Sequence, residues 1–293
     1  MNNAAISVEL RDATESSAVL SLAFGAGSAM PFEGELYGPF CEYAKTLPNM
    51  AAARIVEGDR RVEFLITEPC YWTPQLPFLY DLRLRAEGDR GVDDGFTHSI
   101  GLRRLTTHGR NLRLNGERIV LRGVSDNDFA AERLPQARSA ETALIAPFRD
   151  ATLFNSAAKT GVFIIAAIAR NTGDLTNVLN DLSWRPAAAL ALLDGVAVSA
   201  NASQAARRMN LLLAQRMRAA EAPGPNDVQA AADLVAVELA AGERPPAWMA
   251  SLAKPVIAIR PGGAYADLDE ARAACDRLQA ELAPEFDLAG YFV

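Results

Sequence analysis

Histidine and cysteine are scarce in this chain of 293 residues. With only two histidines, His98 and His108, a histidine-ligated zinc site and a serine–histidine triad both lack parts. The three cysteines, Cys41, Cys70 and Cys275, have no metal-ligand spacing and cannot all pair. We therefore expect buried thiols in a reducing compartment, and neither a metal nor a cofactor.

Long charged and long apolar runs are also missing. A net charge of −7 without a basic run lacks the electrostatic footprint of a nucleic-acid binder. No apolar run reaches the roughly 18–20 residues that cross a bilayer, and residues 1–7 lack the pattern of a signal peptide. We expect a cytoplasmic protein with no nucleic-acid or membrane partner. Half of the residues are hydrophobic, which is enough for a substantial core.

The first part of the chain, residues 6–120, reads in alternating apolar and polar steps. Residues 6–10 and 61–66 show the alternation most clearly, and Gly and Pro turns interrupt it. This pattern predicts a β-sandwich.

A loop within that region is rich in proline. Pro69, Pro74 and Pro77 cannot donate hydrogen bonds to a sheet. We expect the nearby Trp72 and Tyr80 to pack at a sheet end or a domain interface, the alternative for Trp72 being an aromatic platform for a ligand.

After residue 118 the rhythm becomes apolar strand, polar helix, apolar strand, and it repeats to the end. The predicted strands are 119–124, 142–146, 162–168, 188–193, 211–215, 234–238, 256–260 and 286–292. Helical segments between them include 149–159 and 268–282, the latter with one apolar face. Eight such units with nearly unbroken apolar strands predict a closed parallel barrel.

The barrel is small for its type, with roughly 22 residues for each β/α unit. A strand of ~5–6 residues, a helix of ~11 and two short connections fill such a unit, which leaves little length for loops. The sequence stops after the eighth strand, so we expect no eighth helix and an open side. The sandwich, a partner chain or nothing covers that side, and a homo-oligomer or other protein partner is our hypothesis.

Four ordered motifs lie between the two regions. They are Cys-Tyr-Trp-Thr-Pro-Gln-Leu-Pro-Phe-Leu-Tyr at 70–80, Gly-Leu-Arg-Arg at 101–104, Leu-Asn-Gly at 114–116 and Leu-Arg-Gly-Val at 121–124. Their order and spacing resemble the domain junction of glycoside hydrolase family 2, the β-galactosidase, β-glucuronidase and β-mannosidase group. The resemblance implies an immunoglobulin-like β-sandwich over 1–117 and a reduced TIM (β/α)8 barrel over 118–293, without the family's N-terminal jelly-roll domain.

The resemblance also says where catalytic residues belong. The family's acid/base glutamate follows an asparagine at the end of the fourth strand, where this chain has Val196, or at best Asp194. The nucleophile ends the seventh strand, where this chain has Arg260, and a guanidinium cannot attack an anomeric carbon. The family's Asn-Arg-His-Glu-like segment is replaced by Ser-Asp-Asn-Asp at 125–128. The resemblance therefore implies a degenerate member.

A substitute carboxylate pair is available in Asp194 and Glu238, which end the fourth and sixth strands. A retaining glycosidase needs two carboxyl groups about 5–5.5 Å apart. Guanidinium groups near the ends of four other strands belong to Arg149, Arg170, Arg216 and Arg260. We favour an ion-pair network, because arginine partners hold carboxylates ionised.

Two loops after strands carry weaker signals. Gly262 and Gly263, beside Arg260, offer backbone N–H groups to a phosphate, the alternative being an ordinary turn. The acidic residues of 126–128 cannot all face one point, so we expect helix capping there rather than a cation site.

Three functions follow. The leading hypothesis is a catalytically silent family 2-like protein that acts as a binding or structural module. The second is a glycosidase that uses Asp194 and Glu238. The third is a barrel that binds a phosphorylated small molecule through Arg260, Gly262 and Gly263. The expected ligand is a carbohydrate or a phosphorylated small molecule.

Overall fold

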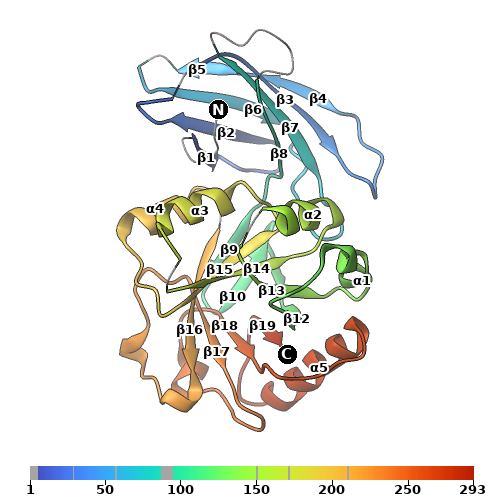
Figure 1. Cartoon of the computed structure of the whole chain (residues 1–293), viewed down its shortest axis with the longest axis vertical. Helices are drawn as coiled ribbons and strands as arrows, with labels where there is room; N and C mark the ends of the chain where they lie inside the picture. The colour runs from blue at the N-terminus through green and yellow to red at the C-terminus, as the bar shows by residue number, and fades with distance from the viewer. Residues whose placement is uncertain are drawn as a thin grey trace.

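A computed structural model describes residues 6–28, 30–56, 58–86, 95–149, 151–170, 172–209 and 211–293. Antiparallel sheets from the N-terminal part lie against one end of a barrel formed by the rest of the chain (Figure 1). Within these residues, no helix is long and apolar enough to cross a bilayer.

The N-terminal part contains two four-stranded antiparallel sheets, ordered β1-β2-β6-β5 and β4-β3-β7-β8. The strands are β1 (Ile6–Arg11), β2 (Ser17–Phe24), β3 (Pro31–Phe40), β4 (Asn49–Ala52), β5 (Arg54–Val56), β6 (Arg61–Thr67), β7 (Leu79–Ala86) and β8 (Phe96–Ile100). Alternate residues of both sheets, such as Leu20, Phe64 and Leu82, form a shared apolar core. The predicted β-sandwich is therefore present, and its assignment as immunoglobulin-like stays a prediction.

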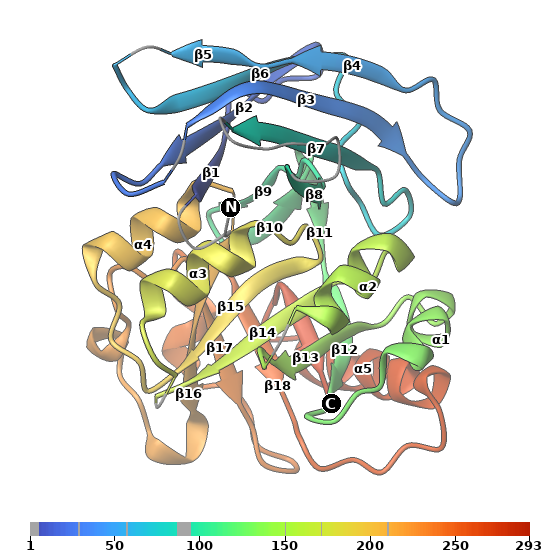
Figure 2. The ribbon, with the colours of Figure 1, turned by 45° about the horizontal axis from the view of Figure 1, so that its top comes forward.

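A third, three-stranded sheet lies between the sandwich and the barrel (Figure 2). Its strands are β9 (Leu105–His108), β10 (Asn111–Leu114) and β11 (Glu117–Ile119). Leu105, Leu112 and Leu114 are buried in the apolar cluster of the barrel, not in that of the sandwich. This sheet therefore closes the N-terminal end of the barrel.

The predicted barrel is confirmed. Eight parallel strands close on themselves, because the first pairs with the last. They are β12 (Leu121–Ser125), β13 (Ala143–Pro147), β14 (Ile164–Ala169), β15 (Ala188–Asp194), β16 (Leu212–Arg218), β17 (Leu234–Glu238), β18 (Val256–Ile259) and β19 (Gly290–Phe292). Each overlaps its predicted range, since strands buried on both faces are nearly continuous apolar runs.

The helical layer is thinner than predicted. The α-helices are α1 (Leu134–Ser139), α2 (Thr152–Thr160), α3 (Leu175–Ser183), α4 (Ala200–Arg207) and α5 (Leu268–Leu282). The prediction of a helix between successive strands is wrong after β16 and β17, where the connections hold only the 3-10 turns η3 (Ala219–Glu221), η4 (Pro225–Asp227) and η5 (Ala247–Ser251). Pro223, Pro225, Pro245 and Pro246 remove backbone donors there, which prevents regular helices.

Helix α5 has the predicted bounds, and Asp267 caps it by accepting a hydrogen bond from the backbone N–H of Glu270 at 2.8 Å. It packs against both β12 and β19, so the last helix lies beside the seam where the barrel closes (Figure 1). The thiol of Cys275 reaches the carbonyl of Gly123 at 3.2 Å. A partner chain on this side stays a prediction.

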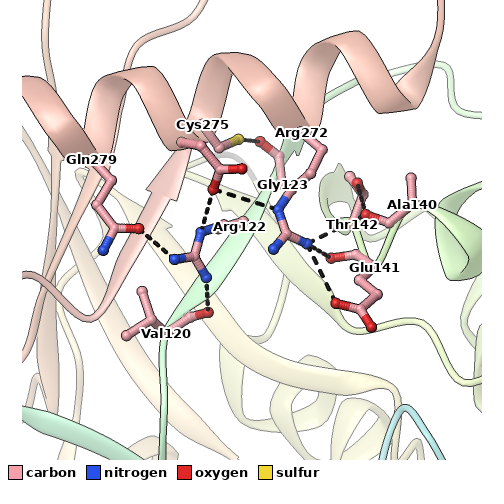
Figure 3. A network of polar contacts seen from close by, with 10 residues as sticks. Val120, Arg122, Gly123, Ala140, Glu141, Thr142, Arg272, Cys275 and Gln279 are labelled. Atoms are coloured by element: carbon pink, nitrogen blue, oxygen red, sulfur yellow. Dashed lines mark hydrogen bonds and ion pairs between the residues drawn. The ribbon is translucent and has the colours of Figure 1, made fainter.

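Polar contacts reinforce the same seam (Figure 3). Arg122 of β12 lies 2.8 Å from the carboxylate of Asp276, and Arg272 donates to the carbonyl of Glu141 at 2.9 Å.

All three cysteines are free thiols, but only Cys275 is fully buried, so the expectation of buried thiols fails for Cys41 and Cys70.

Candidate functional site

The Trp-Thr-Pro loop is a structural joint. The Trp72 side chain is 0% exposed, and its Nε1 donates to the carbonyl of Ala158 at 2.8 Å. Its ring meets Phe163 edge-on at 5.1 Å, while its backbone N–H donates to Leu102 at 2.6 Å. The expected packing of Trp72 is therefore confirmed, against residues of the barrel, and a ligand platform is wrong because the side chain is fully buried. Tyr80 is also buried and accepts a hydrogen bond from the N–H of Cys70 at 2.9 Å.

The Gly-Leu-Arg-Arg motif at 101–104 attaches the segment that follows β8 to the start of β15. A Cβ on Gly101 would lie 2.7 Å from the ring of Pro186, so only glycine permits this approach. Arg103 is 3% exposed and donates to the carbonyls of Pro186 and Ala188. Burial lowers the pKa of Arg103 to about 9. These motif residues hold the two parts of the chain together.

The carboxyl ends of β15, β16 and β17 bring charged side chains together at the barrel mouth. Asp194 is the last residue of β15, and Glu238 is the last residue of β17. Between them, Arg216 and Arg218 of β16 share one face of the strand, because strand side chains alternate. Since β16 pairs with both neighbours, its guanidinium groups lie between the two carboxylates.

The contacts are those of an ion-pair network. Arg216 donates from Nε to Glu238 Oε2 at 2.7 Å, and its Nη2 lies 2.5 Å from the same oxygen. Its Nη1 lies 3.8 Å from Asp194 Oδ2, which also accepts from Arg218 Nη2 at 2.8 Å. Asp194 raises the pKa of Arg218 through this hydrogen bond. The carboxylates of Asp194 and Glu238 are thus each held by a guanidinium group of β16.

The role of Arg218 was not predicted from the sequence, although the sequence contains a pattern that indicates it. Arg216 and Arg218 are separated by one residue within an apolar strand, so both project from the same face. A pair of arginines in this spacing at a strand end predicts a clamp on neighbouring carboxylates.

The remaining predicted arginines do not converge on this pair. Arg149 contacts the exposed carboxylate of Asp128 at 3.1 Å. Arg170 donates from Nε to the carbonyl of Gly195 at 3.0 Å. Each of these arginines therefore contacts a residue that follows a neighbouring barrel strand.

Arg260, where the resemblance places a nucleophile, is turned toward α5. Its two Nη atoms donate to the carboxylate of Glu281 at 2.7 and 2.9 Å, and Nη2 also donates to the carbonyl of Glu243 at 2.9 Å. This contact lowers the pKa of Glu281. The cation expected to hold a phosphate is therefore already paired.

The glycines beside Arg260 have local conformational reasons. Gly262 adopts φ +101°, a backbone conformation that favours glycine. A Cβ on Gly263 would lie 2.0 Å from the hydroxyl oxygen of Tyr265. Both observations fit a turn.

The other family positions also hold structural groups. Val196 packs on the apolar cluster of the barrel. Asp126 accepts from the N–H of Asp128 at 3.0 Å and from Arg133 at 3.1 Å, so the expected helix cap is wrong; the following 3-10 turn begins at Ala131 without a side-chain cap. In the described parts of the chain, no group of three or more His, Cys, Asp or Glu side chains is placed to hold a metal ion.

Comparison with known proteins relates the fold to glycosidases. No protein-family model matches the chain. The β-glucuronidase of Parabacteroides merdae superposes with a TM-score of 0.63 at 13% identity, covering 98% of this chain and 47% of that chain. The β-glucuronidase of Ruminococcus gnavus gives a TM-score of 0.65 at 12% identity, with 97% and 60% covered.

One curated protein shows a local sequence match. A β-galactosidase of Lactococcus lactis subsp. lactis (strain IL1403) is 31% identical over 71 residues, which are 24% of this chain and 7% of the galactosidase. The chain thus spans only part of the proteins it matches. The predicted resemblance to the β-galactosidase and β-glucuronidase group is confirmed at the level of the fold.

Proposed function

We propose that this chain is a glycoside-hydrolase-family-2-like protein without glycosidase activity, whose barrel acts as a binding or structural module. The observation that carries the proposal is the position of Arg216, which contacts Glu238 and Asp194 together at the barrel mouth. A retaining glycosidase needs one carboxylate as nucleophile and a protonated carboxyl group as acid. Both carboxylates are instead engaged by arginine, which supports a structural role for the pair.

The identity of the residue at the end of β18 supports the same proposal. Arg260 stands at the position that the family resemblance gives to the nucleophile, and Glu281 holds it in two hydrogen bonds. An arginine is always protonated near neutral pH and cannot form a glycosyl-enzyme. If a reaction persists, the fold likeness makes glycosyl-bond hydrolysis the one to assay.

A covalent trap tests the proposal. Sugar-shaped aziridines with the galacto and glucurono configurations alkylate a glycosidase nucleophile, and intact-mass spectrometry detects the adduct. We expect the mass of this protein to stay unchanged while an active β-glucuronidase treated in parallel is labelled. An adduct that peptide mapping places on Asp194 or Glu238 would overturn the proposal and restore the glycosidase hypothesis.

A further inference from the structure

A polar hollow of about 300 Å³ lies between the outer face of the sheet β1-β2-β6-β5 and the end of α4. Its floor is a patch of small side chains, since Ser7 of β1 pairs with Ala23 of β2, and Ser21 occupies the next row on the same face. Longer side chains border this floor, with Arg61 directly beside Ala23 and Glu9 beside Ser21. Small residues ringed by long ones create the depression.

Helix α4 closes the hollow from the barrel side. The N–H of Leu10 donates to the carbonyl of Arg208, just after α4, at 2.9 Å, which fixes the helix end against β1. Gln204, Arg207 and Arg208 line this wall. Figure 2 shows β1 lying over α3 and α4.

The charges of the hollow are unbalanced. Three arginines face one carboxylate, that of Glu9, among the lining residues. Arg61 and Arg208 are partly exposed residues, and their guanidinium groups make no ion pair or side-chain hydrogen bond with any residue in the described ranges. Arg207 reaches Asp233 only at 3.8 Å. The guanidinium groups of Arg61 and Arg208 are still reached by solvent, so they are free to bind an anion that enters the hollow.

The neighbouring row of the same sheet shows the usual arrangement. Glu63 lies next to Ser21 and receives ion pairs from both Arg11 and Arg54. The negative charge of Glu63 is thus already balanced by Arg11 and Arg54, and Glu63 makes no ion pair with Arg61. The excess of positive charge is local to the hollow.

A second hollow of about 370 Å³ continues on the far side of Arg208. It shares Ser7, Ala23 and Arg208 with the first and adds the polar side chains of Thr176 and Asn177 from α3. Arg208 therefore lines both hollows, which together form a crevice whose walls carry hydroxyl and amide groups beside apolar residues such as Phe24 and Ala205. Such groups exchange hydrogen bonds with hydroxyls of a ligand, while the planar guanidinium groups match the geometry of an oxyanion.

We propose that this interdomain crevice binds the oxyanion of a small polyhydroxylated molecule, a sugar phosphate or a sugar acid. Arg61 and Arg208 hold the anion, while Glu9, Ser21 and Gln204 contact the hydroxyls. The crevice is separate from the barrel mouth, so this proposal stands or falls independently of catalytic silence.

Thermal unfolding and calorimetry with four probes test the site: inorganic phosphate, glucose 6-phosphate, glucuronate and glucose. We expect a saturable rise in melting temperature with the anionic probes and none with glucose at equal concentration. Tighter binding of glucose 6-phosphate than of glucuronate assigns a phosphate, and the reverse assigns a carboxylate. Added sodium chloride weakens binding, because the attraction is between charges.

Two variants locate the binding. Arg61→Gln and Arg208→Gln each keep length and polarity but remove the charge, and each weakens anion binding by roughly tenfold. The control is Arg83→Gln on β7, an exposed arginine of the other sheet, which binds like the wild type. The proposal is overturned if no probe gives saturable binding, or if Arg61→Gln and Arg208→Gln, shown folded by circular dichroism, bind as tightly as Arg83→Gln.

Discussion

Arg216 and Glu238 form a hydrogen-bonded ion pair across adjacent barrel strands, with Arg216 Nε 2.7 Å from Glu238 Oε2. Both side chains are mostly buried, with 21% and 25% of their surfaces exposed. This pair occupies the part of the barrel where enzymes of this architecture place catalytic groups. The carboxylates at the barrel mouth therefore form ion pairs that hold adjacent strands together.

Removal of this arginine is expected to destabilise the fold. Arg216→Met leaves Glu238 and Asp194 with less compensation for burial, at a cost of about 1–3 kcal/mol in the free energy of unfolding. Urea denaturation followed by circular dichroism measures the change. Arg149→Met is the matched control, because the Arg149–Asp128 pair is exposed at 66% and 85% and contributes roughly 0–1 kcal/mol. Equal effects of both substitutions would contradict the buried network.

The domain joint depends on the indole of Trp72. Trp72→Phe removes the hydrogen bond to Ala158 and leaves a void in a fully buried site, so we expect a loss of about 2–3 kcal/mol. Trp248→Phe provides the comparison. The Nε1 atom of Trp248 also donates a hydrogen bond to a backbone carbonyl, that of Pro223 at 2.8 Å, but Trp248 is only half-buried. Denaturation midpoints should fall clearly more for Trp72→Phe; the opposite order would refute a buried joint.

Steric fit at Gly101 gives a third prediction. Gly101→Ala forces a methyl group to 2.7 Å from the Pro186 ring and 3.2 Å from Trp72 Cβ, and such overpacking costs about 1–3 kcal/mol. Gly173→Ala is the control, since nothing lies within 4 Å of a Cβ there. Calorimetric melting temperatures measure both. A melting temperature of Gly101→Ala as high as that of the control would mean that the two parts of the chain are less closely joined.

The stability of the fold should depend on pH through His98. Burial lowers the pKa of His98, and the positive charge of Arg185 acts in the same direction. Above about pH 6.5, the unfolded-state pKa of histidine, both states are neutral and stability is complete. As the pH falls below this value, the unfolded state takes up the proton first, so stability declines toward the lowered folded-state pKa.

His98→Phe isolates this effect. The imidazole packs edge-on against Trp184 at 4.9 Å, so phenylalanine keeps the aromatic contact without the titration. Urea denaturation at about pH 7 and about pH 5 should show a smaller acid loss for His98→Phe than for the wild type. The exposed His108, changed to phenylalanine, should retain the wild-type loss. An unchanged acid loss in His98→Phe would exclude His98 as the sensor.

The sequence alone predicts the barrel and its last helix well. Leu234–Glu238 and Leu268–Leu282 have the predicted bounds, because an unbroken apolar run and a capped amphipathic stretch are local signals. The prolines after β16 and β17 also indicate that no helix follows these strands. The prediction gave more weight to the eightfold repeat of strand and helix.

The site was less predictable, since it depends on contacts between distant segments. Asp194, Glu238 and Arg216 were placed at the mouth by strand order, but which guanidinium reaches which carboxylate depends on strand register. Arg61 and Arg208 come from different structural parts and meet only through the docking of α4 on β1. No local pattern marks such a pair.

Hydrolysis of aryl glycosides tests catalytic silence most directly. Purified wild type, Asp194→Ala and Glu238→Ala are incubated with aryl β-galactosides, β-glucuronides and β-mannosides that carry a good leaving group, and release of the aryl group is followed by fluorescence. Catalytic silence predicts no release above buffer for any of the three proteins. Turnover by the wild type that both substitutions abolish would contradict it.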